Sequence, residues 1–365
     1  MRQDTTSHIQ RWIIEQKLDA FLVIQPQNRS YLSGWFNDDT EGAGLLVVGE
    51  KQRIVLTNPL YKEIAEKEAT GWTVIVPLAR GYAPAIVELA SEYGWKKIGF
   101  ESAAITYAEY EKIRDAGKDI FTLRSFEQSP VEQLRIVKQP HELELLKHAI
   151  SITDQTFAHI CDWLQPGMTE KEVQWEILRK MVELGADGTS FESLVASGPN
   201  SSMPHAHAGE RQIQVGELIT IDMGARYKGY CADMTRTICL GEPADPRAHE
   251  VYQAVLRSMK TCESGIYGGI SGKDADALAR NSLEDLAVYY VHGTGHGVGL
   301  QIHEGPSLSP RASDDMQLPV GSVVTVEPGV YIPGWGGVRI EDCVLVTENG
   351  SEVLTKSPVG LVISR

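Results

Sequence analysis

The segment 292–306, with the sequence HGTGHGVGLQIHEGP, constrains the fold of this 365-residue chain more than any other segment. Its three histidines, His292, His296 and His303, lie within twelve residues, and the segment also contains five glycines. Glycine permits tight turns and a close approach of the backbone to a ligand. Imidazole binds divalent metals and exchanges protons near neutral pH. The pattern predicts a functional site built on turns, although a glycine-rich surface loop with solvated histidines has the same composition.

The composition of the chain argues against several classes of partner. A chain of 365 residues usually forms two domains, and 42% hydrophobic with 23% charged residues is typical of a globular protein. The net charge is −15 and no cluster of Lys and Arg is visible, so nucleic acid is not an expected partner. We find no apolar run of membrane-spanning length and no signal peptide at the N-terminus.

The cysteines indicate a reducing compartment. There are five, which is an odd number, and no two form a CxxC pair. We therefore interpret them as reduced packing residues and expect a cytoplasmic protein without contact to a membrane.

Residues 1–125 alternate helical and strand patterns, which predicts a mixed sheet with helices packed on it. The predicted helices are 8–16, 61–69 and 84–93, and the predicted strands are 20–24, 44–48, 53–57, 73–76, 97–100 and 121–123. This α/β domain contains no phosphate-binding loop, so we expect it to serve as a scaffold or a lid.

Residues 126–140 form a linker with a connecting helix, and residues 141–365 form a second domain of the α+β class. Its predicted helices are 142–163, 169–184, 247–263 and 272–287, and its predicted strands are 192–196, 218–223 and 230–238, followed by strands and turns from residue 321. The helix at 169–184 begins with a capping box, because Glu172 follows Thr169 by three residues. We expect the helices to lie outside an antiparallel sheet.

Two pairs of acidic residues accompany the histidines. Asp222 and Asp233 flank a turn near Lys228-Gly229, and pairing of the two strands can bring both carboxylates to one face of a hairpin. Aspartate is unusual within strands, although an exposed sheet face with solvated aspartates is an alternative.

The second acidic pair lies near the C-terminus. Glu327 ends one apolar strand, and Glu341 lies on another strand fourteen positions later. Buried carboxylates repel each other unless one is protonated or a cation neutralises them. Four carboxylates together with His296 suit a pair of divalent metal ions, which shared carboxylates can hold about 3.5–4 Å apart around one water molecule.

This array resembles the five-ligand dinuclear centre of the pita-bread metallopeptidases. The two-domain layout resembles the Xaa-Pro aminopeptidases and prolidases, which carry a creatinase-like N-terminal domain, and the resemblance covers essentially the whole chain. It implies an α/β creatinase-like domain followed by an α+β pita-bread catalytic domain. The five implied metal ligands are Asp222, Asp233, His296, Glu327 and Glu341.

The resemblance also implies a role for each ligand. Asp222 would bind one metal ion, His296 and Glu327 the other, and Asp233 and Glu341 both. Glu327 would in addition carry the proton of the attacking water, which makes it catalytic as well. Because the ligands are rich in oxygen, we expect two Mn²⁺ ions, with Co²⁺ or Zn²⁺ as alternatives.

Four further residues match the proline-specific branch of this family. His205 follows Pro204 in a segment whose histidine helps to hold the substrate, although His207 is an alternative. His292 and His303 match the histidines that flank the metal-ligand histidine, and the second would contact the scissile carbonyl. Arg339, two residues before Glu341, matches an active-site arginine.

The implied activity is hydrolysis of the bond between an N-terminal residue and a following proline in a small peptide, by an aminopeptidase or a dipeptidase. The resemblance implies a homodimer, in which the loop 35–42 would approach the partner's site with two aromatic residues that look exposed and three acids.

Other functions are possible for the same fold. One is hydrolysis of another small amide or of creatine, but the creatine enzymes use no metal. Methionine aminopeptidase lacks so large an N-terminal domain. A non-catalytic binding homologue usually loses metal ligands, whereas this chain retains all five.

Overall fold

The computed structural model describes residues 5–36, 43–78, 81–313 and 315–363. By its contacts the chain divides into two compact units, Met1–Arg135 and Ile136–Arg365, and each is described here by itself. Among the described residues, no helix combines the length and the apolar character needed to cross a membrane.

The N-terminal unit is built on one mixed sheet with the strand order β4-β3-β2-β1-β5-β6. β1 pairs antiparallel with β2 and parallel with β5. The strands are β1 (Ala20–Val23), β2 (Gly44–Gly49), β3 (Arg53–Thr57), β4 (Thr73–Ile75), β5 (Lys97–Glu101) and β6 (Thr122–Phe126). All six strands predicted from the sequence are confirmed, and their ends differ by at most three residues.

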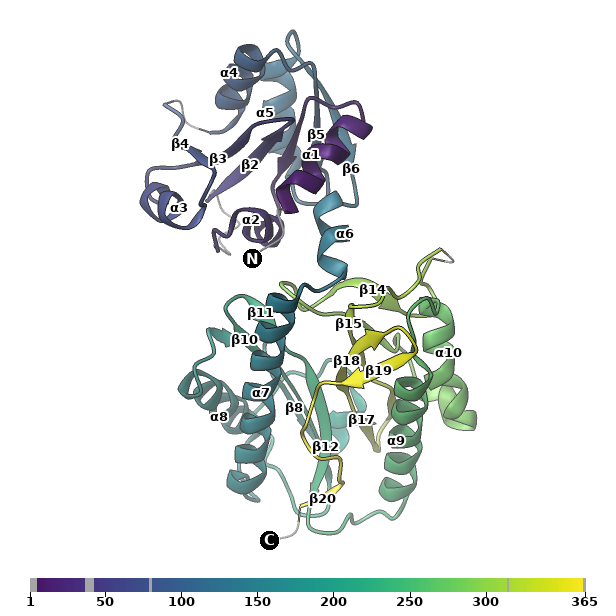
Figure 1. Cartoon of the computed structure of the whole chain (residues 1–365). Coiled ribbons are helices and arrows are strands. Elements are labelled where there is room, and N and C mark those ends of the chain that lie inside the picture. Colours follow the sequence, from purple (N-terminus) through teal and green to yellow (C-terminus); the bar gives the residue numbers. More distant parts are fainter. Residues whose placement is uncertain (1–4, 37–42, 79–80, 314, 364–365) are drawn as a thin grey trace. The chain divides into compact units, whose positions relative to one another are not determined.

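Helices pack on both faces of this sheet (Figure 1). They are α1 (Thr5–Glu15), α2 (Pro26–Ser33), α3 (Lys62–Glu68), α4 (Ala83–Tyr93) and α5 (Tyr107–Gly117). Leu22 of β1 packs in a cluster with Ile86 of α4 and Ile113 of α5. On the other face, Phe21 meets the ring of Trp12 of α1 at a centroid distance of 5.2 Å. A strand covered on both faces is apolar throughout, which explains the uninterrupted run in β1.

The loop that follows α2 differs from its prediction at Trp35. This side chain is only 1% exposed, and its ring lies 5.4 Å from the guanidinium of Arg29 and 6.4 Å from the ring of Tyr61. The prediction that Trp35 is exposed is therefore wrong, because a cation and a second ring cover it. Phe36 is 38% exposed, and residues 37–42, with the three acids, lie outside the described residues.

The C-terminal unit places its helices outside largely antiparallel strands, which confirms the predicted α+β arrangement. Figure 1 shows α7 and α8 on one side of these strands and α9 and α10 on the other. The helix α6 (Pro130–Ile136) belongs to the N-terminal unit except for its last residue. The helices of the C-terminal unit are α7 (Pro140–Trp163), α8 (Glu170–Glu183), α9 (Arg247–Gly265) and α10 (Gly272–Ser282), with short 3₁₀ turns η1 (Gly198–Ser202) and η2 (Glu284–Tyr289).

Among the described residues of this unit, the strands form four small sheets, in the orders β20-β12-β9-β8, β14-β13-β15-β18-β19, β11-β10-β7 and β16-β17. Their bounds are β7 (Gly188–Thr189), β8 (Leu194–Ser197), β9 (Leu218–Met223), β10 (Ala225–Tyr227), β11 (Tyr230–Cys231), β12 (Met234–Leu240), β13 (Gly295–Gly297), β14 (Glu304–Leu308), β15 (Val323–Val326), β16 (Gly329–Ile332), β17 (Gly336–Arg339), β18 (Asp342–Thr347), β19 (Gly350–Val353) and β20 (Val362–Ile363).

Two apolar cores hold the helices against the strands. Ile152 of α7 and Ile177 of α8 pack against Ile221 of β9 in one core. Val255 of α9 packs with Val324 of β15 in the other. Each helix buries one apolar stripe, as the sequence periodicity predicts. The predicted capping box of α8 is confirmed as well.

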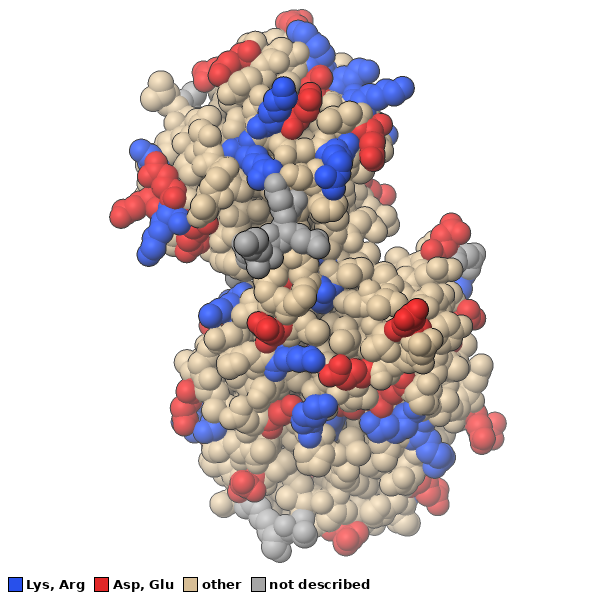
Figure 2. All heavy atoms as spheres, in the orientation of Figure 1, with Lys and Arg blue, Asp and Glu red and all other residues tan. Residues whose placement is uncertain are grey.

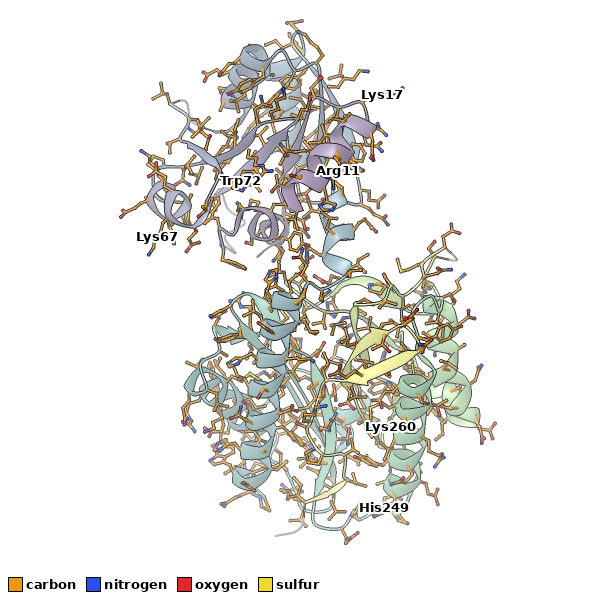
Figure 3. All side chains as sticks on the ribbon, viewed as in Figure 1. Arg11, Lys17, Lys67, Trp72, His249 and Lys260 are labelled. Atoms are coloured by element: carbon orange, nitrogen blue, oxygen red, sulfur yellow. The ribbon has the colours of Figure 1, made fainter. Side chains whose placement is uncertain are left out.

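On the face shown in Figure 2, acidic and basic residues are interspersed on each unit. Lys260, labelled in Figure 3, lies on α9, and its Nζ is 2.8 Å from Glu263 and 3.6 Å from Asp342 at the start of β18. The second of these ion pairs connects the helix to the strand that follows Glu341.

Candidate active site

Two antiparallel strands place Asp222 and Asp233 at the same end of a sheet. Met223 of β9 pairs with Met234 of β12, so Asp222 lies in β9 and Asp233 directly before β12. Between them, β10 and β11 form a hairpin whose turn, Lys228-Gly229, has φ angles of 48° and 82°. Two left-handed residues are what a two-residue hairpin turn requires, so the predicted turn is confirmed.

The predicted strand 230–238 is interrupted, and this correction matters for the site. β11 ends at Cys231 and β12 begins at Met234. The hairpin bends at Gly224, where a Cβ would overlap the carbonyl oxygen of Ala232. The break frees Asp233 from the regular ladder, so that its carboxylate can turn toward the other acidic residues.

The other three predicted ligands come from the five-stranded sheet and its edges. His296 lies in β13, Glu327 directly follows β15, and Glu341 lies between β17 and β18. β13 runs between β14 and β15, and a Cβ on Gly295 or Gly297 would overlap a carbonyl oxygen of a neighbouring strand. The glycines on each side of His296 therefore let the neighbouring backbones close around it.

All nine predicted site residues line one cavity of about 500 Å³. They are His205, Asp222, Asp233, His292, His296, His303, Glu327, Arg339 and Glu341. His207 is not among the lining residues, so the structure favours His205 for the position at the cavity.

Three of these side chains form a compact group. Asp233, His296 and Glu341 each offer one ligand atom, and the three atoms lie within 4.8 Å of one another. His296 Nε2 is also 3.4 Å from Glu327 Oε1. Asp222 presents a buried Oδ1 that has no hydrogen-bond partner among the described residues, while its Oδ2 accepts from Arg339 Nη2 at 2.6 Å. A buried carboxylate oxygen without a donor is suited to a cation.

The charges of this cavity also suit cations. Burial, reinforced by the neighbouring carboxylates, raises the pKa values of Asp233 and Glu341 well above their usual range. Burial likewise raises the pKa of Glu327 to about 8. Burial lowers the pKa of His296 to about 4, with His303 acting in the same direction, so its imidazole is neutral and able to bind a metal. Four carboxylates, two of them buried and two partly buried, together with one neutral imidazole fit two divalent metal ions.

His292 and Arg339 meet at a tyrosine that the sequence reasoning missed. His292 Nδ1 lies 2.8 Å from the carbonyl oxygen of Gly293, which can only accept, so Nδ1 carries the proton. Nε2 then accepts from the hydroxyl of Tyr331 at 2.8 Å, and Arg339 Nη1 donates to the same hydroxyl at 2.8 Å. Burial lowers the pKa of His292 to about 4, which keeps this ring neutral.

Thr235 is the second residue that was missed. Its Oγ1 donates to Glu341 Oε2 at 2.7 Å and accepts from Arg339 Nε at 3.0 Å. A signal for it was available, since Thr235 follows Asp233 by two residues and side chains two apart in extended chain share a face. Tyr331 had no such signal, because Glu327 follows β15 whereas Tyr331 lies in β16 of a different sheet.

His303 lies beside the compact group without belonging to it. Its ring packs against that of His296 at a centroid distance of 4.3 Å and an interplanar angle of 73°. Burial lowers the pKa of His303, so it is neutral and can donate one hydrogen bond.

Comparisons with known proteins identify the family of this chain. Residues 144–348 match the profile of metallopeptidase family M24, and residues 6–137 match the creatinase/prolidase N-terminal domain. An Xaa-Pro dipeptidase of Pyrococcus furiosus is 32% identical, over 95% of this chain and 96% of the relative.

Solved structures show the same similarity. An Xaa-Pro dipeptidase from Bacillus anthracis superposes with a TM-score of 0.91 at 38% identity, covering 98% of this chain and 99% of the other. An X-Pro aminopeptidase from Thermotoga maritima superposes with a TM-score of 0.87 at 31% identity, covering 96% and 98%. The resemblance inferred from the motifs is confirmed, and the chain belongs to metallopeptidase family M24, with a creatinase/prolidase N-terminal domain before its pita-bread catalytic domain.

Proposed function

We propose that this protein is a metallo-exopeptidase that hydrolyses the peptide bond between an N-terminal residue and a following proline. The observation that carries the proposal is the convergence of four carboxylates, four histidines and Arg339 around a single cavity. Its relatives named as Xaa-Pro dipeptidases and X-Pro aminopeptidase support the proline specificity.

The cavity residues divide into ligands for two metal ions. In this proposal Asp222 would hold one ion, His296 and Glu327 would hold the other, and Asp233 and Glu341 would be shared between them. The short distances among Asp233, His296 and Glu341 support this assignment. Two such ions supply Lewis acidity that polarises a carbonyl and activates water. The oxygen-rich ligand set favours Mn²⁺, with Co²⁺ or Zn²⁺ as alternatives.

The remaining steps belong to side chains of this protein. Glu327, whose Oε1 accepts from Thr325 Oγ1 at 3.3 Å, takes a proton from the attacking water and passes it to the leaving nitrogen. The nitrogen of an Xaa-Pro bond carries no hydrogen, so the departing proline needs this proton to leave as an amine. His303 donates to the scissile carbonyl oxygen as negative charge develops there.

Two histidines and Arg339 hold the reactants in place. In the proposal His205, at the cavity wall, binds the substrate, and His292 presents a neutral ring fixed by Tyr331. Arg339 orients Asp222 through Nη2 at 2.6 Å and Tyr331 through Nη1 at 2.8 Å. Arginine is suited to this task because its planar group donates in several fixed directions.

A substrate panel tests the proposal and decides between the two exopeptidase types. We expect turnover of Xaa-Pro substrates only with divalent metal, and none of the matched Xaa-Ala peptides. Hydrolysis of Xaa-Pro-Xaa tripeptides would identify an aminopeptidase, whereas hydrolysis of dipeptides alone would identify a dipeptidase. The assay measures the released N-terminal residue with Mn²⁺, Co²⁺ and Zn²⁺ in turn.

The same panel addresses the alternatives. Turnover of another small amide or of creatine, without turnover of any Xaa-Pro peptide, would favour a different hydrolase of this fold. If none of these compounds were hydrolysed with any of the three metals, a non-catalytic binding homologue would be the better explanation.

The proposal includes a homodimer in the cytoplasm. None of the five cysteines is in a disulfide, which suits a reducing compartment. We expect light scattering on the eluting peak of a sizing column to give twice the mass of one 40.2 kDa chain. A mass of one chain across the concentrations used for assays would contradict the dimer.

A further inference from the structure

A buried carboxylate outside the cavity has no role in the chemistry described so far. Glu170 is the first residue of α8 and is 0% exposed. The nearby guanidinium of Arg211 donates from Nη1 and Nη2 to Glu217, at 2.6 Å each. A carboxylate removed from water is costly unless hydrogen bonds replace its hydration.

The hydrogen bonds of Glu170 come from both ends of one segment. Oε1 accepts from the backbone N–H of Ser197 at 2.7 Å and from its hydroxyl at 2.8 Å. Asn200 Nδ2 lies 3.1 and 3.2 Å from the two carboxylate oxygens. Oε2 accepts from the backbone N–H of Gly209 at 3.1 Å. One carboxylate therefore binds residues that precede and follow the stretch 201–208, and His205 lies in that stretch.

Further contacts leave the backbone around His205 little freedom. Ser201 Oγ accepts from the backbone N–H of Gly337 at 2.8 Å. The carbonyl oxygen of Pro204, directly before His205, accepts from Arg339 Nη1 at 3.2 Å. Directly after His205, Ala206 packs in a small apolar cluster with two residues of β8. The side chain of His205 itself remains exposed at the cavity wall.

We propose that Glu170 is a positioning residue for His205. Its carboxylate holds the two ends of the segment 197–209 together, and this sets where the imidazole of His205 meets the substrate. Glu170 does not line the cavity, so it acts through the segment alone. The effect of Glu170 on substrate binding rests on the proposed function. Its effect on the order of the segment 197–209 does not.

The first experiment compares Glu170→Gln with Glu172→Gln. Both residues lie in the first turn of α8, but the carboxylate of Glu172 caps the helix through Thr169 and does not reach the His205 segment. In Glu170→Gln an amide NH₂ group replaces one carboxylate oxygen and faces N–H groups that also donate. If it replaces Oε2, the backbone N–H of Gly209 and Asn200 Nδ2 each lose this acceptor. We expect faster hydrogen exchange in residues 198–209 for Glu170→Gln and unchanged exchange there for Glu172→Gln.

Kinetics separate positioning from a general loss of stability. For Glu170→Gln we expect KM for an Xaa-Pro substrate to rise about tenfold, with a smaller change in kcat and full metal content. A purely structural defect would lower the active fraction and hence the apparent kcat, but would leave KM unchanged. If Glu170→Gln does not fold, Asn200→Ala removes one donor only and should change exchange and KM in the same direction.

A double-mutant cycle decides whether Glu170 acts through His205. In a His205→Ala background, Glu170→Gln should change KM by less than about twofold, because the residue that it positions is absent. Fully additive effects would overturn the proposal. If the wild-type enzyme hydrolysed no Xaa-Pro peptide, the proposed function would fail, and the exchange comparison would still decide: equal exchange in the two α8 variants would overturn the positioning role by itself.

Discussion

The Asp233→Asn and Glu341→Gln variants should each lose turnover by a factor of about 10³ or more, together with bound metal. A metal ion supplies several kcal/mol of transition-state stabilisation, and each 1.4 kcal/mol corresponds to about tenfold in rate. Both substitutions keep the size of the side chain and remove one charge from the compact group around His296. Elemental analysis of the purified variants gives the metal content per chain, and kcat/KM gives the loss of activity.

A buried carboxylate elsewhere in the same unit provides the control. Burial raises the pKa of Glu263 on α9 to about 7, and its neighbours Lys260 and Asp342 do not line the cavity. Glu263→Gln should therefore keep both metal and turnover.

Treatment of the wild-type enzyme with EDTA should abolish activity, and adding Mn²⁺ should restore it. Full activity after EDTA, or in either ligand variant, would disprove the dinuclear centre.

Local signals in the sequence predicted much of the fold. Most strands of the N-terminal sheet contain an apolar run between turn residues, so their positions follow from the pattern. The strand β6, which reads TLRSF, has the weakest run, and its predicted end is three residues short. The helix α8 begins at its capping box, and the Lys228-Gly229 turn adopts the φ angles that its hairpin requires. Each of these features depends on residues close together in the chain, which a pattern can show.

The helix α2 shows what such patterns miss. Its buried residues include Asn28, Arg29 and Ser30, so no apolar stripe marks it. Its start is stabilised by Glu101 of β5, whose carboxylate accepts from the backbone N–H groups of Ile24 and Gln25 and from Asn28 Nδ2, at 2.7 Å each. Glu101 lies more than seventy residues from α2 in the sequence, so the pattern around α2 does not reveal this stabilising carboxylate.

The candidate site was predictable for a different reason. The two acidic pairs and the three histidines of the segment 292–303 were singled out by the pattern itself. His205, Arg339 and the role of each of the nine residues came from the resemblance to a family, because no spacing rule connects Asp222 to His296 or to Glu341. The residues that were missed, Tyr331 and Thr235, are uncharged and act by hydrogen bonds to residues that were named. Their hydrogen bonds to Arg339 and Glu341 depend on how β12, β16 and β17 lie in the folded chain, which no local pattern gives.

His303 and His296 should respond differently to removal, although their rings touch. His303→Ala should lower kcat by about 10² to 10³, the loss typical of one donor to a developing oxyanion, while metal content stays near the wild-type value. His296→Ala should lose metal as well, because its imidazole belongs to the compact group with Asp233 and Glu341. Metal per chain, kcat and KM for one Xaa-Pro substrate are measured on both variants.

The conservative substitution His303→Gln makes the comparison sharper. An amide can donate one hydrogen bond from a similar position, so it should recover part of the kcat lost in His303→Ala without altering metal content. Loss of packing against the His296 ring, at 4.3 Å between centroids, could instead disturb the ligand itself. In that case His303→Ala would lose as much metal as His296→Ala, and adding metal would restore its activity. That result would mean that His303 holds the ligand His296 in position. It would contradict the proposal that His303 donates a hydrogen bond to the scissile carbonyl.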